Sequence, residues 1–181
     1  MLRIEVPGEE FWDEVNEEFI YTKPVTLQLE HSLVSLSKWE SKWHKAFFGK
    51  QDKTDEELTD YIRCMTVTQN VDPEVYSRLS SENYREINEY IENPMTATTF
   101  YNREPKNTVG GETVTAELIY YWMVSFNIPV EFQKWHLNRL LTLIRVCSVK
   151  NAPPKKHSKQ EIMSRNAALN AARKKQLGTH G

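Results

Sequence analysis

Glu40 and His44 are the residue pair whose types and spacing most directly suggest chemistry. They lie four positions apart in the stretch HSLVSLSKWESKWHKAFFG. At about 100° per residue, a helix through this stretch places both side chains on the same half as its large apolar residues. Three interpretations are open: a hydrated contact between the two side chains, part of a metal site, or part of a protein-binding face.

A metal site would need further ligands, and the sequence offers no paired spacing for them. The candidates are single residues scattered along the chain, namely His31, Cys64, His136 and Cys147. Without C-x-x-C or H-x-x-x-H spacing, we expect neither a metal nor another cofactor. A nucleophilic cysteine beside His136 stays open, because such partners meet in space rather than in sequence.

Motifs of the common catalytic classes are missing from the sequence. The glycines lie at positions 8, 49, 110, 111, 178 and 181, which makes neither G-x-G-x-x-G nor G-x-x-x-x-G-K. The sequence also contains no G-x-S-x-G and no H-E-x-x-H. We therefore expect a protein that is not an enzyme.

Aromatic residues recur along the segment that carries Glu40 and His44. Trp39, Trp43 and Phe47 have the helical spacing that helix-in-groove recognition uses, with Ser32 as the expected N-cap and Gly49 as the expected stop. The alternative is that these rings belong to the core. The predicted partner-binding site consists of Trp39, Glu40, Trp43, His44 and Phe47.

Two short segments near the N-terminus alternate apolar and polar residues, which is typical of strands. They run through Leu2, Ile4 and Val6 and through Val25, Leu27 and Leu29. We expect the two strands to pair antiparallel, with an acidic loop or short helix between them.

The remainder of the chain has mainly helical signals. Helix starts are predicted at the Thr54–Glu57 capping box, at Asp72-Pro73, at Ser80 or Ser81, and at Pro129, which should open a long helix. The segment 115–127 is apolar around nearly the whole helical wheel and should be a central helix. Residues 95–112 predict a short extended piece followed by a mobile loop.

These patterns predict a mainly α fold with two parts. Residues 1–150 form a compact helical domain with a small N-terminal antiparallel β element, and residues 151–181 form a basic helical tail after Pro153-Pro154. A capping box from Ser158 to Glu161 opens the tail. Residues that contact a partner from the tail are predicted to be Arg165, Leu169, Arg173, Lys174 and Lys175.

Charge is divided between the two ends of the chain, although the net charge is only −2. Seven acidic residues face a single arginine within the first twenty positions, and eight lysines and arginines face only Glu161 from Lys150 onward. The ends could attract each other within one molecule or between copies, or the basic end could bind nucleic acid.

Targeting signals are not recognisable in the sequence. The first twenty residues are acidic, without a positively charged start, and the longest apolar run, Leu118–Val124, is too short for a membrane span. We expect a soluble intracellular protein with no membrane partner.

Five segments of packing and surface motifs stand out along the chain. They are LEHSLVSLSKWESKW (29–43), PMTATTF (94–100), ELIYYWMV (117–124), QKWHLNRLLTLIRVC (133–147) and SRNAALNAARKKQLGTHG (164–181). Together these segments resemble a family of tailed-phage proteins, the siphophage-type tail assembly chaperones, and the similarity covers nearly the whole chain.

This resemblance implies a non-enzymatic protein of the host cytoplasm that is absent from the mature virion. Such a protein binds the long helical tape measure protein, keeps its apolar stripes from aggregating, and helps tail tube subunits polymerise around it. Two alternatives remain: a head-tail adaptor or tail-completion protein that stays in the virion, and a nucleic-acid-binding regulator that acts through the basic tail.

Overall fold

The structure is a computed structural model, which describes residues 1–14, 17–100, 113–152 and 159–178. The chain divides into two compact units, Met1–Ser148 and Val149–Gly181, each described here by itself. Ser158 of the expected capping box and residues 101–112 of the expected loop lie outside the described residues.

The predicted strand pair is confirmed. β1 (Leu2–Val6) and β4 (Val25–Leu29) run antiparallel, with Leu2 opposite Leu29 and Val6 opposite Val25. One face of this two-stranded sheet is buried and carries Ile4, Val6, Leu27 and Leu29. The alternation read from the sequence therefore separates the core side of the sheet from its outer side.

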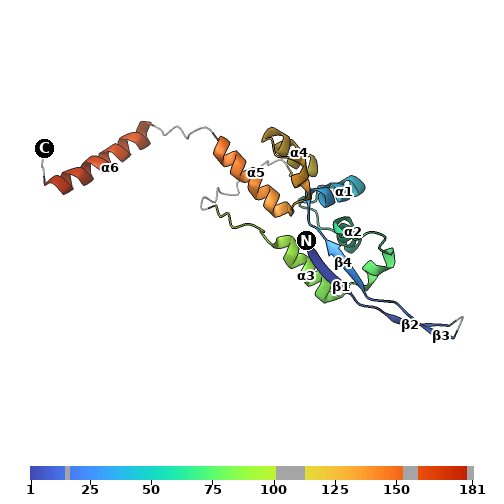
Figure 1. Cartoon of the computed structure of the whole chain (residues 1–181). Coiled ribbons are helices and arrows are strands. Elements are labelled where there is room, and N and C mark those ends of the chain that lie inside the picture. Colours follow the sequence, from blue (N-terminus) through green and yellow to red (C-terminus); the bar gives the residue numbers. More distant parts are fainter. Residues whose placement is uncertain (15–16, 101–112, 153–158, 179–181) are drawn as a thin grey trace. The chain divides into compact units, whose positions relative to one another are not determined.

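The acidic segment between these strands is a second β-hairpin, so the expected loop or short helix is wrong. β2 (Glu10–Asp13) and β3 (Glu18–Tyr21) pair antiparallel, and Figure 1 shows them continuing the ribbon of β1 and β4. Aromatic and β-branched residues favour this extended pairing. The surrounding glutamates obscured that signal in the sequence.

Helices make up most of the rest of the first unit, and side-chain caps fix where four of the α-helices begin. Ser32, Thr54, Ser80 and Thr115 each accept a hydrogen bond from the backbone N–H three residues later. The elements are α1 (Leu33–Trp43), α2 (Asp55–Met65), η1 (Pro73–Arg78), α3 (Ser81–Glu92), α4 (Ala116–Ser125), η2 (Val130–Lys134) and α5 (Leu137–Asn151).

Two expected helices differ from the structure. Pro129 precedes the short 3-10 helix η2, and the long helix α5 begins only at Leu137. α4 is not central, because Tyr121 and Val124 are 65% and 76% exposed while Ile119 and Met123 on its other side are buried. An apolar surface on α4 is thus left open to solvent.

α1 joins the two parts of the hydrophobic core. Its Leu33 and Leu36 pack in a cluster with buried residues of α4 and α5. Its Trp39 belongs to the other cluster, which gathers the β1–β4 sheet, α2, η1 and α3. The mainly helical fold with a small N-terminal antiparallel sheet is confirmed.

The second unit contains α6 (Lys159–Leu177). Every side chain that the structure describes in this helix is exposed, including Leu169 at 46% and Leu177 at 74%. An alanine-rich sequence favours the helix locally, without a core of its own. None of the described helices combines the length and the apolar character that crossing a membrane requires.

Candidate functional site

Trp39 of the predicted site belongs to the core. Its side chain is 1% exposed, and its indole N–H donates a hydrogen bond to the carbonyl oxygen of Glu57 at 2.8 Å. The ring meets Phe47 edge-on, with centroids 5.2 Å apart, and Trp43 and Phe47 are themselves partly buried against this cluster. These three rings therefore pack in or against the core, which is the alternative interpretation of the sequence pattern.

Glu40 is buried and does not form the hydrated contact with His44 that its spacing suggested. One carboxylate oxygen accepts from the backbone N–H of Phe47 at 2.8 Å, and the other from that of Ala116 at 2.7 Å. A carboxyl group has two oxygens, so Glu40 can accept from both backbone donors at once. Glu40 thereby joins the end of α1 to the loop after it and to the first residue of α4.

His44 ends α1 in place of the expected Gly49. Its φ of 52° is left-handed, and its backbone N–H donates to the carbonyl oxygen of Glu40 at 2.8 Å. The helix therefore stops five residues before the glycine, and the His44 side chain is exposed. Glycine is the residue that usually takes this position.

Replacing His44 with glycine should stabilise the protein by about 0.5–1 kcal/mol, because glycine adopts a positive φ without steric cost. Chemical denaturation of His44→Gly and of the parent chain measures the difference. A destabilised variant would mean that the imidazole makes a contact worth more than the backbone strain.

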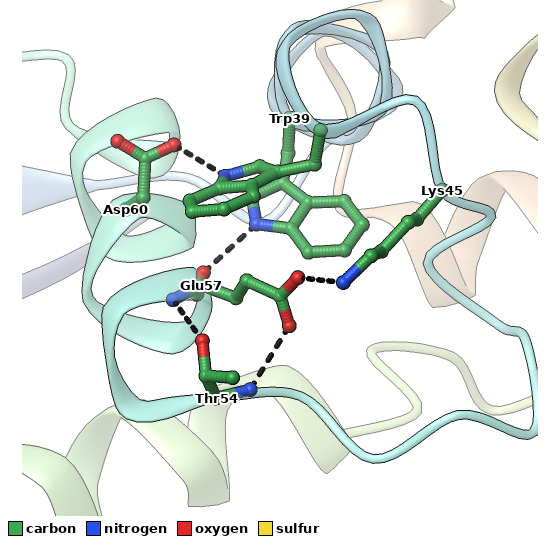
Figure 2. A network of polar contacts seen from close by, with 6 residues as sticks. Trp39, Lys45, Thr54, Glu57 and Asp60 are labelled. Carbon is green, nitrogen blue, oxygen red and sulfur yellow. Dashed lines mark hydrogen bonds and ion pairs between the residues drawn. The ribbon is translucent and has the colours of Figure 1, made fainter.

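A polar network fixes α2 against the end of α1, as Figure 2 shows around Glu57. Glu57 is 2% exposed; its carboxylate pairs with Lys45 and accepts from the backbone N–H of Thr54 at 2.9 Å. These two bonds hold the pKa of the Glu57 carboxyl below its usual value. Asp60 accepts from the indole N–H of Trp43 at 2.9 Å and pairs with Lys42.

A pocket of about 830 Å³ opens beside this network. The rings of Trp39 and Phe48 contribute to its lining, with His44 and three lysines, Lys45, Lys50 and Lys53, around them. The Lys53 ammonium lies 4.4 Å from the centroid of the Phe47 ring, a cation–π distance. The pocket therefore includes two residues of the predicted site, Trp39 and His44; Phe48 is its exposed aromatic ring, and Asp52 and Glu57 line it beside the lysines.

A buried histidine pair was missed by the sequence analysis. The rings of His31 and His136 lie 5.1 Å apart between centroids, although the two residues are far apart in the chain. His31 Nδ1 is 2.6 Å from the hydroxyl of Tyr61, and His136 Nε2 is 3.0 Å from the carbonyl oxygen of Tyr90. No spacing rule could have joined them, because the antiparallel bridge between Ser32 and His136 forms only in the folded chain.

Both histidines are held neutral by burial. Desolvation, with His136 nearby, lowers the pKa of His31 from 6.5 to about 3, and desolvation also lowers the pKa of His136. Unfolded histidine has the ordinary pKa, so below about pH 6.5 the unfolded chain binds more protons. Acid should therefore favour unfolding.

The free energy of unfolding should fall by about 1–2 kcal/mol between pH 7.5 and 5.5, before most carboxyl groups titrate. Denaturant titrations across this range measure the loss, and His44→Gln serves as a control because His44 is exposed. An unchanged free energy of unfolding over that range would contradict the burial of two neutral histidines.

The remaining candidate residues are dispersed. Arg165, Leu169, Arg173, Lys174 and Lys175 all lie exposed on α6. Cys64 and Cys147 are partly buried free thiols, and burial raises the pKa of Cys64. Within the described ranges, no three His, Cys, Asp or Glu side chains gather as a metal site would require.

No protein-family model, curated protein or solved structure matches the chain.

Proposed function

We propose that this protein is a tail assembly chaperone of a siphophage-type phage. It binds the tape measure protein and assists polymerisation of the tail tube protein around it, without catalysing a reaction. It acts in the host cytoplasm and is absent from the mature virion. The five segments quoted above, which resemble that family along nearly the whole chain, support the assignment.

The pocket beside α1 is the observation on which the proposed binding mode rests. Its volume of about 830 Å³ lies within the range of binding pockets in proteins. Phe48 is 44% exposed at its edge, so part of its ring is open to a partner. A partner side chain inserted there would bury the Phe48 ring.

An amphipathic helix fits this pocket chemically. Helices that bind in grooves insert apolar side chains at i, i+3, i+4 and i+7. Lys50 and Lys53 on the rim would pair with carboxylates that flank such an apolar stripe, since Lys45 already pairs with Glu57. The tape measure protein is long and helical and has such stripes, so it is the partner we propose.

Co-expression with the tape measure and tail tube proteins of the same phage genome tests the proposal. We expect the tape measure protein to remain soluble and to co-purify with this chain on an affinity tag. If the tape measure protein aggregates to the same extent with and without this chain, the proposal is wrong.

Two further assays separate the alternatives. Mass spectrometry of purified virions should not detect this chain, whereas a head-tail adaptor would be present in stoichiometric amount. The exposed cations of α6 are the feature that favours a nucleic-acid-binding regulator. That alternative predicts retardation of DNA at low salt, with an affinity that falls steeply as salt rises.

A further inference from the structure

The β2–β3 hairpin carries an exposed aromatic face. Trp12 and Phe19 are directly opposite each other in the register, and their rings meet edge-on with centroids 4.8 Å apart. Together with Tyr21 they are 50%, 54% and 69% exposed. Three large rings on one side of a two-stranded ribbon are far more apolar surface than a solvated hairpin needs.

The base of this hairpin is held firmly. The backbone N–H of Thr22 donates to the carbonyl oxygen of Glu9 at 2.8 Å, and the Glu9 N–H donates to the Thr22 hydroxyl at 2.7 Å. Arg78 donates to the carbonyl oxygen of Pro7 and to the Thr22 hydroxyl. Gly8 is required here, since an added Cβ would lie 2.1 Å from the Thr22 carbonyl oxygen. A ribbon fixed in this way presents its aromatic face without first being ordered.

Acidic side chains surround the hairpin and define the charge of its partner, with Glu10 on the same face as the rings and Glu18 on the opposite face. Those described as exposed are Glu9, Glu10, Glu14, Glu17 and Glu18. Two such hairpins would repel each other if they paired edge to edge. The occupant of this face must therefore be basic, and it must tolerate contact with aromatic rings.

α6 has the chemistry that this face requires. Arg165, Leu169 and Arg173 follow one another at four-residue steps, so they share one side of the helix. All three are exposed. The two arginines are separated by about 12 Å along the helix axis, comparable with the roughly 10 Å that β2 spans from Glu10 to Asp13.

We propose that the β2–β3 hairpin of one copy binds α6 of a second copy of this chain. Leu169 packs on the exposed rings, and Arg165 and Arg173 pair with the glutamates or lie over the aromatic faces. If each copy contributes a hairpin and a helix, a closed dimer contains the contact twice. Self-association is a property beyond the binding of a tape measure protein, and it stands on different residues.

Charge reversal of the full chain tests this contact. Glu10→Lys/Glu18→Lys reverses the charge of two hairpin side chains, and Arg165→Glu/Arg173→Glu reverses the charge of two helix side chains. All four positions are exposed. Sedimentation at low salt should give the mass of a dimer for the parent and the mass of a monomer for each variant alone. High salt should raise the dissociation constant of the parent dimer at least about tenfold.

Mixing the two variants gives the decisive result. The lysine hairpin of one then meets the glutamate helix of the other, and the acidic hairpin meets the basic helix, so a dimer should re-form. An intramolecular contact cannot be rescued in this way. Glu92→Lys/Glu131→Lys, which reverses two exposed glutamates outside the hairpin, should leave the dimer unchanged. A parent chain that is monomeric at low salt, or a mixture that stays monomeric, overturns the proposal.

Discussion

Replacing Trp39 with alanine should lower the free energy of unfolding by about 3–5 kcal/mol, because it removes a large buried ring and leaves a cavity. Trp39 is 1% exposed, and its loss also removes the donor to the Glu57 carbonyl oxygen. A domain with a few kcal/mol of stability would be largely unfolded by this change. Urea titration of the variant and the parent gives the value.

Trp12→Ala is the matched control for this substitution. Trp12 is 50% exposed on the β2–β3 hairpin and touches Phe19 rather than the core. We expect it to change the free energy of unfolding by less than about 1 kcal/mol under conditions where the chain is monomeric. Equal losses for the two tryptophans would contradict the distinction between a core ring and an exposed one.

Replacing Glu40 with alanine should cost about 2–5 kcal/mol, since the backbone N–H groups of Phe47 and Ala116 would both lose their acceptor. Glu40→Gln retains one carbonyl oxygen and should lose less stability. Thermal and denaturant unfolding of the two variants provide the measurement.

The outcome for Glu40 also separates a structural role from a binding role. If Glu40 only holds α1 to α4, its replacement lowers the fraction of folded molecules. Each molecule that is still folded then binds its partner as the parent does. Parent-like stability in both variants would contradict the buried double acceptor.

Local sequence rules predicted much of the secondary structure. Ser32 and Thr54 mark the starts of α1 and α2 because their hydroxyls cap N–H groups three residues later, which is a local interaction. The pairing of β1 with β4 followed from period-two alternation, since only one face of that sheet is buried. Elements that depend on interactions between neighbouring residues could therefore be predicted from the sequence.

Features that depend on contacts between residues far apart in the sequence could not be predicted from local patterns. The i, i+4 spacing of Glu40 and His44 suggested a mutual contact, yet Glu40 bonds to Ala116 and the histidine ends the helix. His31 and His136 meet only because the tertiary fold aligns Ser32 with His136. Of the predicted partner site, Trp39 and His44 line the pocket, and Phe48, which was not among the predicted site residues, lines it as well.

The most direct test of the account is the amount of tape measure protein that co-purifies with a Phe48→Ala variant. Phe48 is exposed at the pocket, and its removal should leave the fold intact but reduce the recovered tape measure protein about tenfold relative to the parent. Tyr121→Ala removes an even more exposed aromatic side chain outside the pocket, 65% against 44% for Phe48, and should leave the recovery unchanged. Parent-like recovery with Phe48→Ala, or a loss only with Tyr121→Ala, would contradict the assignment of the pocket as the binding site.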